Sequence, residues 1–217
     1  MSNFDSRVSE ELAQMSKAEA LAAAQEKMRL DGASATAINV FTDYFHQLET
    51  GVTGLIPEDT IDPITSVESI EEFELDPKQA SEALGKTVFL KLNGGLGTSM
   101  GLDKAKSLLP VRDGKTFLEI IFDQIRAARR NSGREVPLLL MNSFRTRSDC
   151  APLFPDDLKI SGLPIDFVQG REPKLVTDSL APISWPEDPS LEWCPPGHGD
   201  IFTSLYDLQL LDQLLDA

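Results

Sequence analysis

The stretch VFLKLNGGLGTSMG, residues 88–101, decides the fold of this chain, because a run of strand-forming residues ends there in four glycines within eight residues. A strand that empties into a glycine-rich loop is how α/β folds present backbone N–H groups to a phosphate. Glycine is needed because a Cβ would block close approach of the ligand and because such loops often require a positive φ. We therefore expect a buried strand over residues 87–92 and a phosphate-binding loop over 93–105, with a merely structural tight turn as the alternative.

The glycine spacing argues against two common phosphate-binding patterns. A dinucleotide fingerprint, G-x-G-x-x-G, started at Gly95 continues with Gly97 but reaches Met100 where the third glycine belongs. A Walker A loop needs a glycine and a lysine at its sixth and seventh positions, and no start among these glycines supplies them. What remains is a glycine-rich loop followed by Lys104 and Lys106, which suits a triphosphate because amides cradle it and an ammonium neutralises it.

The composition is that of a soluble globular protein, with 217 residues, 41% apolar and 25% charged. The formal charge of −15 argues against nucleic acid as a partner, and no apolar run approaches the length of a membrane span. The N-terminus lacks the pattern of a secretory signal, and the two cysteines lack metal-ligand spacing, so we expect a cytoplasmic protein with ordinary thiols.

Charge is unevenly distributed along the chain. Residues 58–76 carry eight acids and no base, whereas residues 86–134, which contain the glycine loop, carry ten bases against four acids. Positive charge concentrated around one loop of an acidic protein favours a small anionic ligand, although a solvated helix end rich in arginine explains part of the pattern.

The pattern of apolar residues predicts an N-terminal helical segment and acidic connection, 1–85, followed by an α/β nucleotide-binding segment, 86–217. In the first segment we expect helices over 6–31, restarted by a capping box at Ser16 and Glu19, and over 34–50, then an irregular arm and a short helix that begins at Asp76-Pro77. In the second we expect strands and helices in alternation, which is the pattern of a parallel sheet. Its strands are expected at 87–92, 136–141 and 164–168, and its helices at 116–131, 144–150 and 201–216, the last with Asp200 as N-cap.

Polar residues follow the second and third predicted strands. Asn142 and Ser143 follow one, and Gln169 follows the other. In open α/β sheets those strand ends face the ligand crevice. A glutamine amide can pair with the imide edge of a uracil, but a loop glutamine taken alone is usually structural. A second glycine-containing loop, Pro195-Pro196-Gly197-His198-Gly199-Asp200, enters the last helix, where backbone N–H groups favour an anion.

These segments resemble the UDP-glucose pyrophosphorylases (UTP–glucose-1-phosphate uridylyltransferases). The resemblance covers residues 87–205, about the N-terminal half of a family member, and is carried by four stretches in order. They are Leu92–Leu102 with Lys106-Ser107, Val136–Phe144, Phe167-Val168-Gln169, and Pro195–Asp200. It implies a Rossmann-like, GT-A-like nucleotidyltransferase fold with a mixed or parallel sheet, and synthesis of UDP-glucose and pyrophosphate from UTP and glucose 1-phosphate with Mg²⁺.

The resemblance also implies roles for particular residues. Gly94 and Gly95 are expected to approach uracil, phosphates and sugar substrate, with Leu92 and Asn93 beside the nucleotide. Lys106 is expected to act catalytically on the triphosphate, and Gln169 to read the base. Gly197 is expected at the nucleotide and His198 at the sugar phosphate.

Two departures from the family pattern affect these expectations. The usual Gly-Pro-Lys-Ser reads here Lys104-Ala105-Lys106-Ser107, so Lys104 competes with Lys106 for the triphosphate. Family members continue past the position of Ala217 with a metal-binding motif and most of the sugar contacts, so we expect no metal ligand in this chain, an incomplete sheet, and no UDP-glucose synthesis by residues 1–217 alone. An unpaired sheet edge and an uncovered apolar face favour a homo-oligomer or partial disorder.

Alternatives stay open at this stage. Within the same class they are UDP-N-acetylhexosamine or broad-specificity UDP-sugar pyrophosphorylases, because the sugar-selecting residues mostly lie past this chain. In other classes they are a non-catalytic nucleotide-binding fragment and a Rossmann oxidoreductase, the latter disfavoured by the missing third glycine.

Overall fold

The computed structural model describes residues 11–52 and 54–216, and the chain divides into two compact units. The first unit holds residues up to 58 together with 170–207, and the second holds 59–169 with 208–217. This division differs from the expected boundary at residue 85, because residues 170–207 group with the N-terminal helices and not with the strands that precede them.

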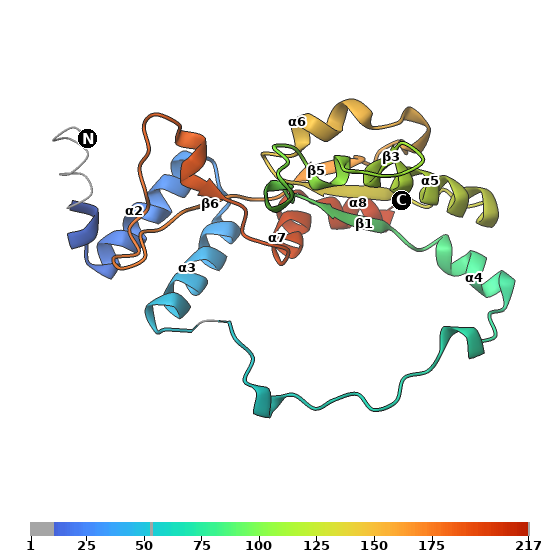
Figure 1. Ribbon diagram of the computed structural model, residues 1–217, viewed down its shortest axis with the longest axis horizontal. Helices are drawn as coiled ribbons and strands as arrows, with labels where there is room; N and C mark the ends of the chain where they lie inside the picture. The colour runs from blue at the N-terminus through green and yellow to red at the C-terminus, as the bar shows by residue number, and fades with distance from the viewer. Residues whose placement is uncertain (1–10, 53, 217) are drawn as a thin grey trace. The chain divides into compact units, whose positions relative to one another are not determined.

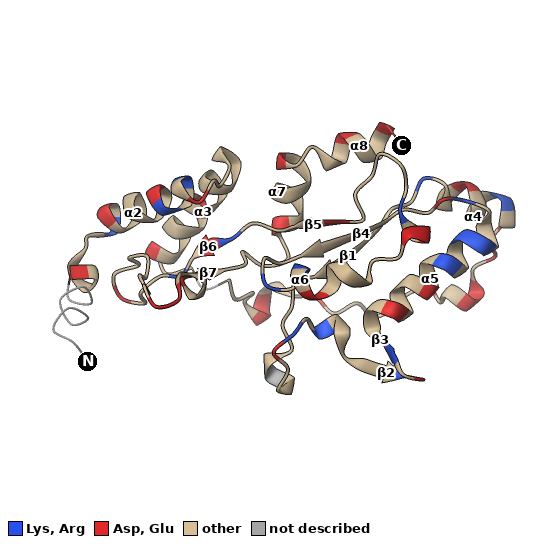
Figure 2. Ribbon diagram, turned by 90° about the horizontal axis from the view of Figure 1, so that it is seen from above, with Lys and Arg blue, Asp and Glu red and all other residues tan. Residues whose placement is uncertain are grey.

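The second unit is built on a three-stranded parallel sheet in the order β1-β4-β5 (Figure 2). Its strands are β1 (Phe89–Asn93), β4 (Leu138–Asn142) and β5 (Asp166–Val168). Asn93 pairs in register with Asn142, and Asn142 with Val168, so the carboxyl ends of all three strands lie at one edge of the sheet. The predicted parallel α/β sheet is confirmed.

The strands differ in burial. Every residue of β4 is buried, as expected for the central strand of a parallel sheet. The expectation of a buried β1 is wrong, because β1 is an edge strand of this sheet and Phe89, Lys91 and Leu92 are exposed. The run of apolar letters in β1 does not distinguish an edge strand from a central one, since both carry strand formers.

Helix α5 (Phe117–Ser132) packs on the sheet. It begins at a capping box between Thr116 and Glu119 and ends before Gly133, which has a φ of 66°. Its Leu118, Phe122 and Ile125 form one core cluster with Leu138 and Leu140 of β4. The sequence predicts a shared apolar face of Phe117, Ile120, Ile121 and Ile125; Ile125 and Ile121 do pack in this core, but Phe117 is exposed. Basic residues gather in the last turns of the helix (Figure 2).

The other elements of the second unit are short. They are α4 (Pro77–Leu84), the hairpin of β2 (Pro110–Arg112) and β3 (Lys115–Thr116), α6 (Arg147–Cys150) and α8 (Leu210–Asp216). The predicted irregular arm before α4 is confirmed, with two single turns of 3₁₀ helix at Glu58–Thr60 and Ile70–Glu72.

In the first unit, α2 (Lys17–Leu30) and α3 (Ala35–Glu49) pack together and α2 contacts β6 (Glu172–Pro173), as Figure 1 shows. The predicted capping box at Ser16 and Glu19 is confirmed and begins α2; residues 6–10 of the predicted helix lie outside the described residues. β6 pairs antiparallel with β7 (Trp193–Cys194), and α7 (Asp200–Asp207) completes the unit. Ion pairs from Lys27 to Glu192 and from Arg171 to Asp31 join the helices to the segment 170–194.

The single helix expected over residues 201–216 is wrong. The chain forms α7 and α8 instead, with Gln209 in the left-handed region at a φ of 54°. The sequence predicts one apolar face through Ile201, Leu205, Leu208, Leu211 and Leu215. Leu208, Leu211 and Leu215 are exposed, and Leu210 is buried instead. Over residues 11–52 and 54–216, no helix combines the length and the hydrophobicity needed to cross a membrane.

Candidate nucleotide-binding site

The glycine-rich segment of the second unit forms a closed loop after β1. Leu96 and Ala105 face each other in an antiparallel bridge, closed on one side by Lys106 N–H donating to Gly95 O at 2.9 Å and on the other by Gly97 N–H donating to Lys104 O at 3.1 Å. The methyl group of Ala105 belongs to the core cluster beneath α5, with 1% of the residue exposed. The loop is therefore anchored in the core.

The structural requirement for glycine differs between positions of the loop. A Cβ added at Gly94 would lie 2.8 Å from Nε2 of Gln169, and one added at Gly97 would lie 2.6 Å from Cδ1 of Leu102. Gly101 has a φ of 72°, which disfavours a side chain. A Cβ at Gly95 would meet nothing within 4 Å. Gly95 therefore leaves open space above the loop, while Gly94 lets the backbone reach Gln169.

Gln169 follows β5 directly and lies against Gly94, as its place at a strand end predicts. Its backbone N–H donates to Asn142 O at 2.8 Å, and only 7% of the residue is exposed. Within the described part of the chain its side-chain amide has no hydrogen-bond partner, yet none of its polar atoms is sealed from solvent. A glutamine that is largely buried but has an uncommitted amide can pair with a ligand.

The two lysines of the loop flank the buried Ala105. In extended backbone, side chains alternate in direction, so an inward Ala105 directs Lys104 and Lys106 outward. Both lysines are exposed, and neither has an ion-pair partner among residues 11–52 and 54–216. Lys106 is bonded through its backbone to Gly95, the glycine with open space above it. Leu92, also expected at the nucleotide, is 44% exposed on β1.

Asn93 lies in a buried polar network at the carboxyl ends of the strands. Its Nδ2 donates to Asn142 Oδ1 at 2.7 Å and to Cys150 Sγ at 3.2 Å, which uses both of its donor protons. Thr146 Oγ1 donates to Asn93 O at 2.9 Å. The amide of Asn93 therefore organises the strand ends beneath the loop.

Sequence reasoning missed the residues of α6 that contact the loop. Asp149 Oδ2 accepts from Ala105 N–H at 3.2 Å, and Cys150 Sγ lies 3.7 Å from Ser107 Oγ. Neither residue follows a periodic pattern or a motif. The only available signal is their position in the segment after the second strand, where α/β folds place ligand-binding loops.

Gly197 and His198 belong to the first unit. Gly197 has a φ of 105°, which only glycine adopts readily, and His198 is exposed. The prediction of Asp200 as N-cap is wrong, because Asp200 is the first residue of α7. Its carboxylate instead accepts from Gly170 N–H at 2.6 Å and from Ser204 Oγ at 2.9 Å. The short loop before α7 is thus joined to the residue that follows Gln169 in sequence.

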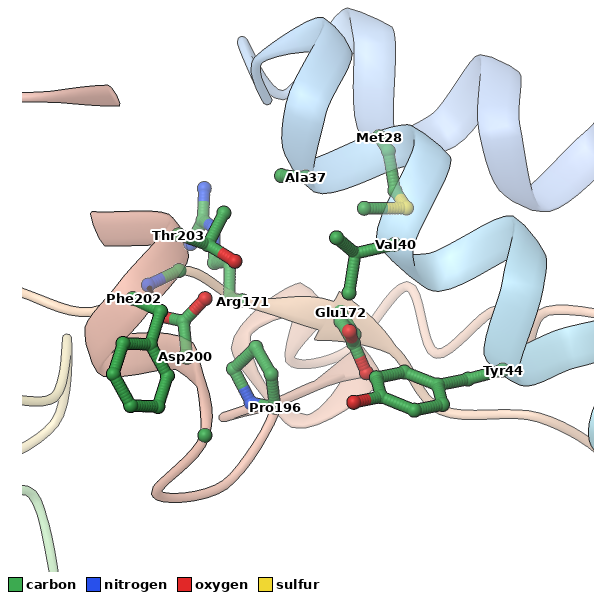
Figure 3. A pocket seen from close by; sticks show the side chains of 12 residues that line it. Met28, Ala37, Val40, Tyr44, Arg171, Glu172, Pro196, Asp200, Phe202 and Thr203 are labelled. Carbon is green, nitrogen blue, oxygen red and sulfur yellow. Dashed lines mark hydrogen bonds between the residues drawn. The ribbon is translucent and has the colours of Figure 1, made fainter. Parts of the chain in front are cut away.

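Beside this junction the first unit contains a cavity of about 330 Å³ (Figure 3). The two helices contribute Met28, Val40 and Tyr44 to its lining, and residues 170–207 contribute Glu172, Pro196, Asp200 and Phe202. Burial, with a smaller contribution from the Asp200 carboxylate, raises the pKa of Glu172 to about 7. Burial also raises the pKa of Asp200, although the hydrogen bonds from Gly170 and Ser204 act in the opposite direction.

The raised pKa of Glu172 makes the stability of the chain depend on pH. Because the folded state holds this proton more tightly than the unfolded state, the stabilisation is complete below the ordinary glutamate pKa of 4.5 and is lost as the pH rises toward 7. Glu172→Gln keeps a neutral side chain at every pH. We expect this variant to exceed the wild type at pH 8 by about 1–2 kcal/mol in the free energy of unfolding, with solvent screening allowed for.

The measurement is urea unfolding at pH 5.5 and pH 8, with Glu187→Gln, an exposed carboxylate of the same unit, as the control. The gap between Glu172→Gln and the wild type should widen from pH 5.5 to pH 8, and the Glu187→Gln curves should follow the wild type. A gap that does not change with pH would contradict the assignment.

The described residues do not form a protein site for a metal ion, since no three His, Cys, Asp or Glu side chains among them are grouped to hold one. Two carboxylates near the strand ends are already engaged: Asp149 accepts from Ala105, and Asp166 accepts from Asn142 and Arg147.

A parallel sheet whose first strand ends in a core-anchored glycine loop, with a glutamine directly after the third strand, is typical of α/β nucleotide-binding proteins. The family model described as UTP--glucose-1-phosphate uridylyltransferase matches residues 38–217. The chain belongs to this family.

Known proteins agree with this assignment. The chain is 41% identical over 165 residues to the UTP--glucose-1-phosphate uridylyltransferase of Solanum tuberosum, covering 74% of this chain and 32% of that protein. It is 42% identical over 154 residues to the Saccharomyces cerevisiae protein of the same description, covering 68% of this chain and 30% of the relative. The chain therefore spans about a third of the length of these relatives.

Solved structures share the fold. A mutant UDP-glucose pyrophosphorylase from Leishmania major, crystallised with UDP-glucose, is 37% identical with a TM-score of 0.81, over 91% of this chain and 41% of that one. The Trypanosoma brucei structure described as UDP-glucose phosphorylase is 38% identical with a TM-score of 0.80, over 91% of this chain and 42% of that one. The expected Rossmann-like α/β fold with N-terminal helices is confirmed.

Proposed function

We propose that this chain is the UTP-binding part of a uridylyltransferase that forms UDP-glucose and pyrophosphate from UTP and glucose 1-phosphate. The observation that carries the proposal is the contact between Gly94 and Gln169. It puts a carboxamide that has no hydrogen-bond partner among residues 11–52 and 54–216 beside a loop with open space above Gly95. The carboxamide suits the imide edge of uracil, and the loop with Lys106 suits a triphosphate.

The reaction requires no nucleophile from the protein. A phosphate oxygen of glucose 1-phosphate attacks the α-phosphorus of UTP in line and forms a new P–O bond. The bond from that phosphorus to the oxygen bridging to the β-phosphate breaks, and pyrophosphate leaves with the electron pair. The protein accelerates the reaction by holding the two anionic substrates in line and by offsetting their negative charge.

The roles of the residues follow from the resemblance and from the chemistry of each group. We assign Gln169 and Gly94 to the uracil base. We assign Gly95 and Lys106 to the triphosphate, with Leu92 and Asn93 beside the nucleotide. We assign Gly197 and His198 to the nucleotide and the sugar phosphate. In this proposal Mg²⁺ binds the phosphates of UTP and offsets their charge.

The proposal extends to the cellular compartment, the charge of the substrates and the association of the chain. Two free cysteines fit a reducing compartment, so we place the protein in the cytoplasm. The net charge of −15 favours small anionic substrates held at a local basic site over a nucleic-acid partner. The exposed edge of β1 leaves room for association of two copies.

The test combines UTP binding by calorimetry, with and without Mg²⁺, and pyrophosphate release from UTP with glucose 1-phosphate. We expect UTP to bind more tightly than CTP. UTP binding without pyrophosphate release is the result expected of residues 1–217 alone, and pyrophosphate release above background would contradict that expectation. Equal binding of UTP and CTP would contradict the role of Gln169, and no binding of either would contradict the proposal as a whole.

A further inference from the structure

We propose that Asp149 of α6 is a positioning residue of the lysine-bearing loop: its carboxylate fixes the backbone of Ala105 and thereby sets Lys106 beside Gly95. The contact is Asp149 Oδ2 accepting from Ala105 N–H at 3.2 Å. The geometry belongs entirely to the second unit, and its consequence for UTP rests on the function proposed above.

The bridge between Leu96 and Ala105 explains why this acceptor is needed. The two hydrogen bonds that close the bridge are made by the neighbours, from Lys106 to Gly95 and from Gly97 to Lys104. In such a pair the N–H of the facing residue points away from the partner segment. Ala105 is 1% exposed, so water does not readily replace a missing acceptor for its N–H. The carboxylate of Asp149 supplies that acceptor, and its charge strengthens the bond.

Helix α6 is itself held from two sides, so Asp149 is not a mobile surface carboxylate. Thr146 Oγ1 donates to Asn93 O at 2.9 Å, which ties the start of α6 to the end of β1. Cys150 Sγ accepts from Asn93 Nδ2 at 3.2 Å and lies 3.7 Å from Ser107 Oγ, which ties its end to both arms of the loop. These hydrogen bonds, together with the one from Ala105 to Asp149, join β1, α6 and the loop in the absence of a ligand. Groups that are already ordered lose less conformational entropy when a ligand binds.

The charge of Asp149 argues against a direct role at the phosphates. A carboxylate beside a triphosphate would repel it, and one oxygen of Asp149 is already committed to Ala105. Its effect is therefore exerted through the backbone of Ala105 and the residue that follows, Lys106. The pairing explains how a loop with four glycines holds one lysine in a defined place.

A double-mutant cycle separates positioning from general destabilisation. The variants are Asp149→Ala, Lys106→Ala and the two combined, with Asp149→Asn as the conservative replacement and Asp156→Ala as the control. Asp156 is an exposed aspartate that pairs with Lys159 at the surface. Each is measured for UTP affinity by calorimetry and for amide hydrogen exchange over residues 94–109, after circular dichroism has shown that it is folded.

We expect Asp149→Ala to weaken UTP binding about three- to tenfold and to speed exchange in the loop. In the Lys106→Ala background it should cost little more, because it acts through that lysine and the pair is not additive. Asp149→Asn should recover most of the affinity, since its amide oxygen still accepts from Ala105, and Asp156→Ala should match the wild type. If Asp149→Ala does not fold, Asp149→Ser takes its place in the cycle.

Two results would overturn the inference. One is a double variant whose loss of UTP affinity equals the product of the losses in the two single variants. The other is wild-type UTP affinity and wild-type hydrogen exchange in Asp149→Ala. Failure of the proposed function gives a different result. Lys106→Ala would then bind UTP like the wild type, while Asp149→Ala would still speed hydrogen exchange in the loop. That result would support the structural role of Asp149 and contradict a nucleotide-binding role for Lys106.

Discussion

Lys106→Ala is expected to weaken UTP binding by roughly ten- to a hundredfold, because a hydrogen bond to a charged group contributes about 1.5–3 kcal/mol. Lys106 is exposed and has no ion-pair partner within residues 11–52 and 54–216. Its backbone is bonded to Gly95, so its side chain starts next to the part of the loop with open space. The loss should shrink as salt rises, since salt screens an exposed charge.

Lys104→Ala is the matched comparison. Lys104 is two residues away and is also exposed. Its carbonyl accepts from Gly97 N–H, and at Gly97 the side chain of Leu102 fills the space that a Cβ would need. Calorimetric titration with UTP at two ionic strengths ranks the two lysines. A larger loss for Lys104→Ala would mean that the alignment of Lys104-Ala105-Lys106-Ser107 with the family's Gly-Pro-Lys-Ser is shifted.

Gln169→Ala is expected to lower UTP affinity by about 1–3 kcal/mol, because it leaves buried polar groups of the base without a partner. The same change should reduce discrimination between UTP and CTP, whose bases present different donor and acceptor patterns. Gln169→Met keeps the approximate length of the side chain without the amide or a charge, so a similar loss in that variant separates hydrogen bonding from packing.

Competition between UTP and CTP in a binding assay measures both effects. Gln124→Ala, on the exposed side of α5, is the control for loss of a carboxamide. The side chain of Gln169 lies against Gly94, so circular dichroism melting accompanies the titrations to exclude unfolding. Unchanged selectivity in a folded Gln169→Ala would remove this residue from the site.

The parts of the fold predicted from sequence are those set by local signals. The capping box at Ser16 fixes one helix start because it uses residues three apart in sequence, and the helix expected over 116–131 begins within one residue of α5. The all-apolar run of β4 indicated a central parallel strand, and the glycines after β1 indicated a loop with special backbone requirements.

The parts that sequence reasoning missed depend on contacts between distant residues. Nothing in the residues near Asp200 shows that its carboxylate binds Gly170 N–H, 30 positions away. The contact from Asp149 to Ala105 spans 44 positions and follows no motif. The raised pKa of Glu172 depends on burial among residues from three separate stretches of the chain. The periodicity of apolar residues likewise predicted one C-terminal helix, but Gln209 adopts a left-handed backbone conformation that separates α7 from α8.

The burial of Ala105 limits how this segment can change in evolution. Its methyl group sits in the same core cluster as Leu118 and Phe122, while the lysines on either side face outward. Inserting or deleting one residue between Gly97 and Ala105 would exchange these directions and drive an ammonium group into that core. The loop should therefore tolerate substitution at exposed positions such as Asp103 far better than any change of length, unlike most surface loops.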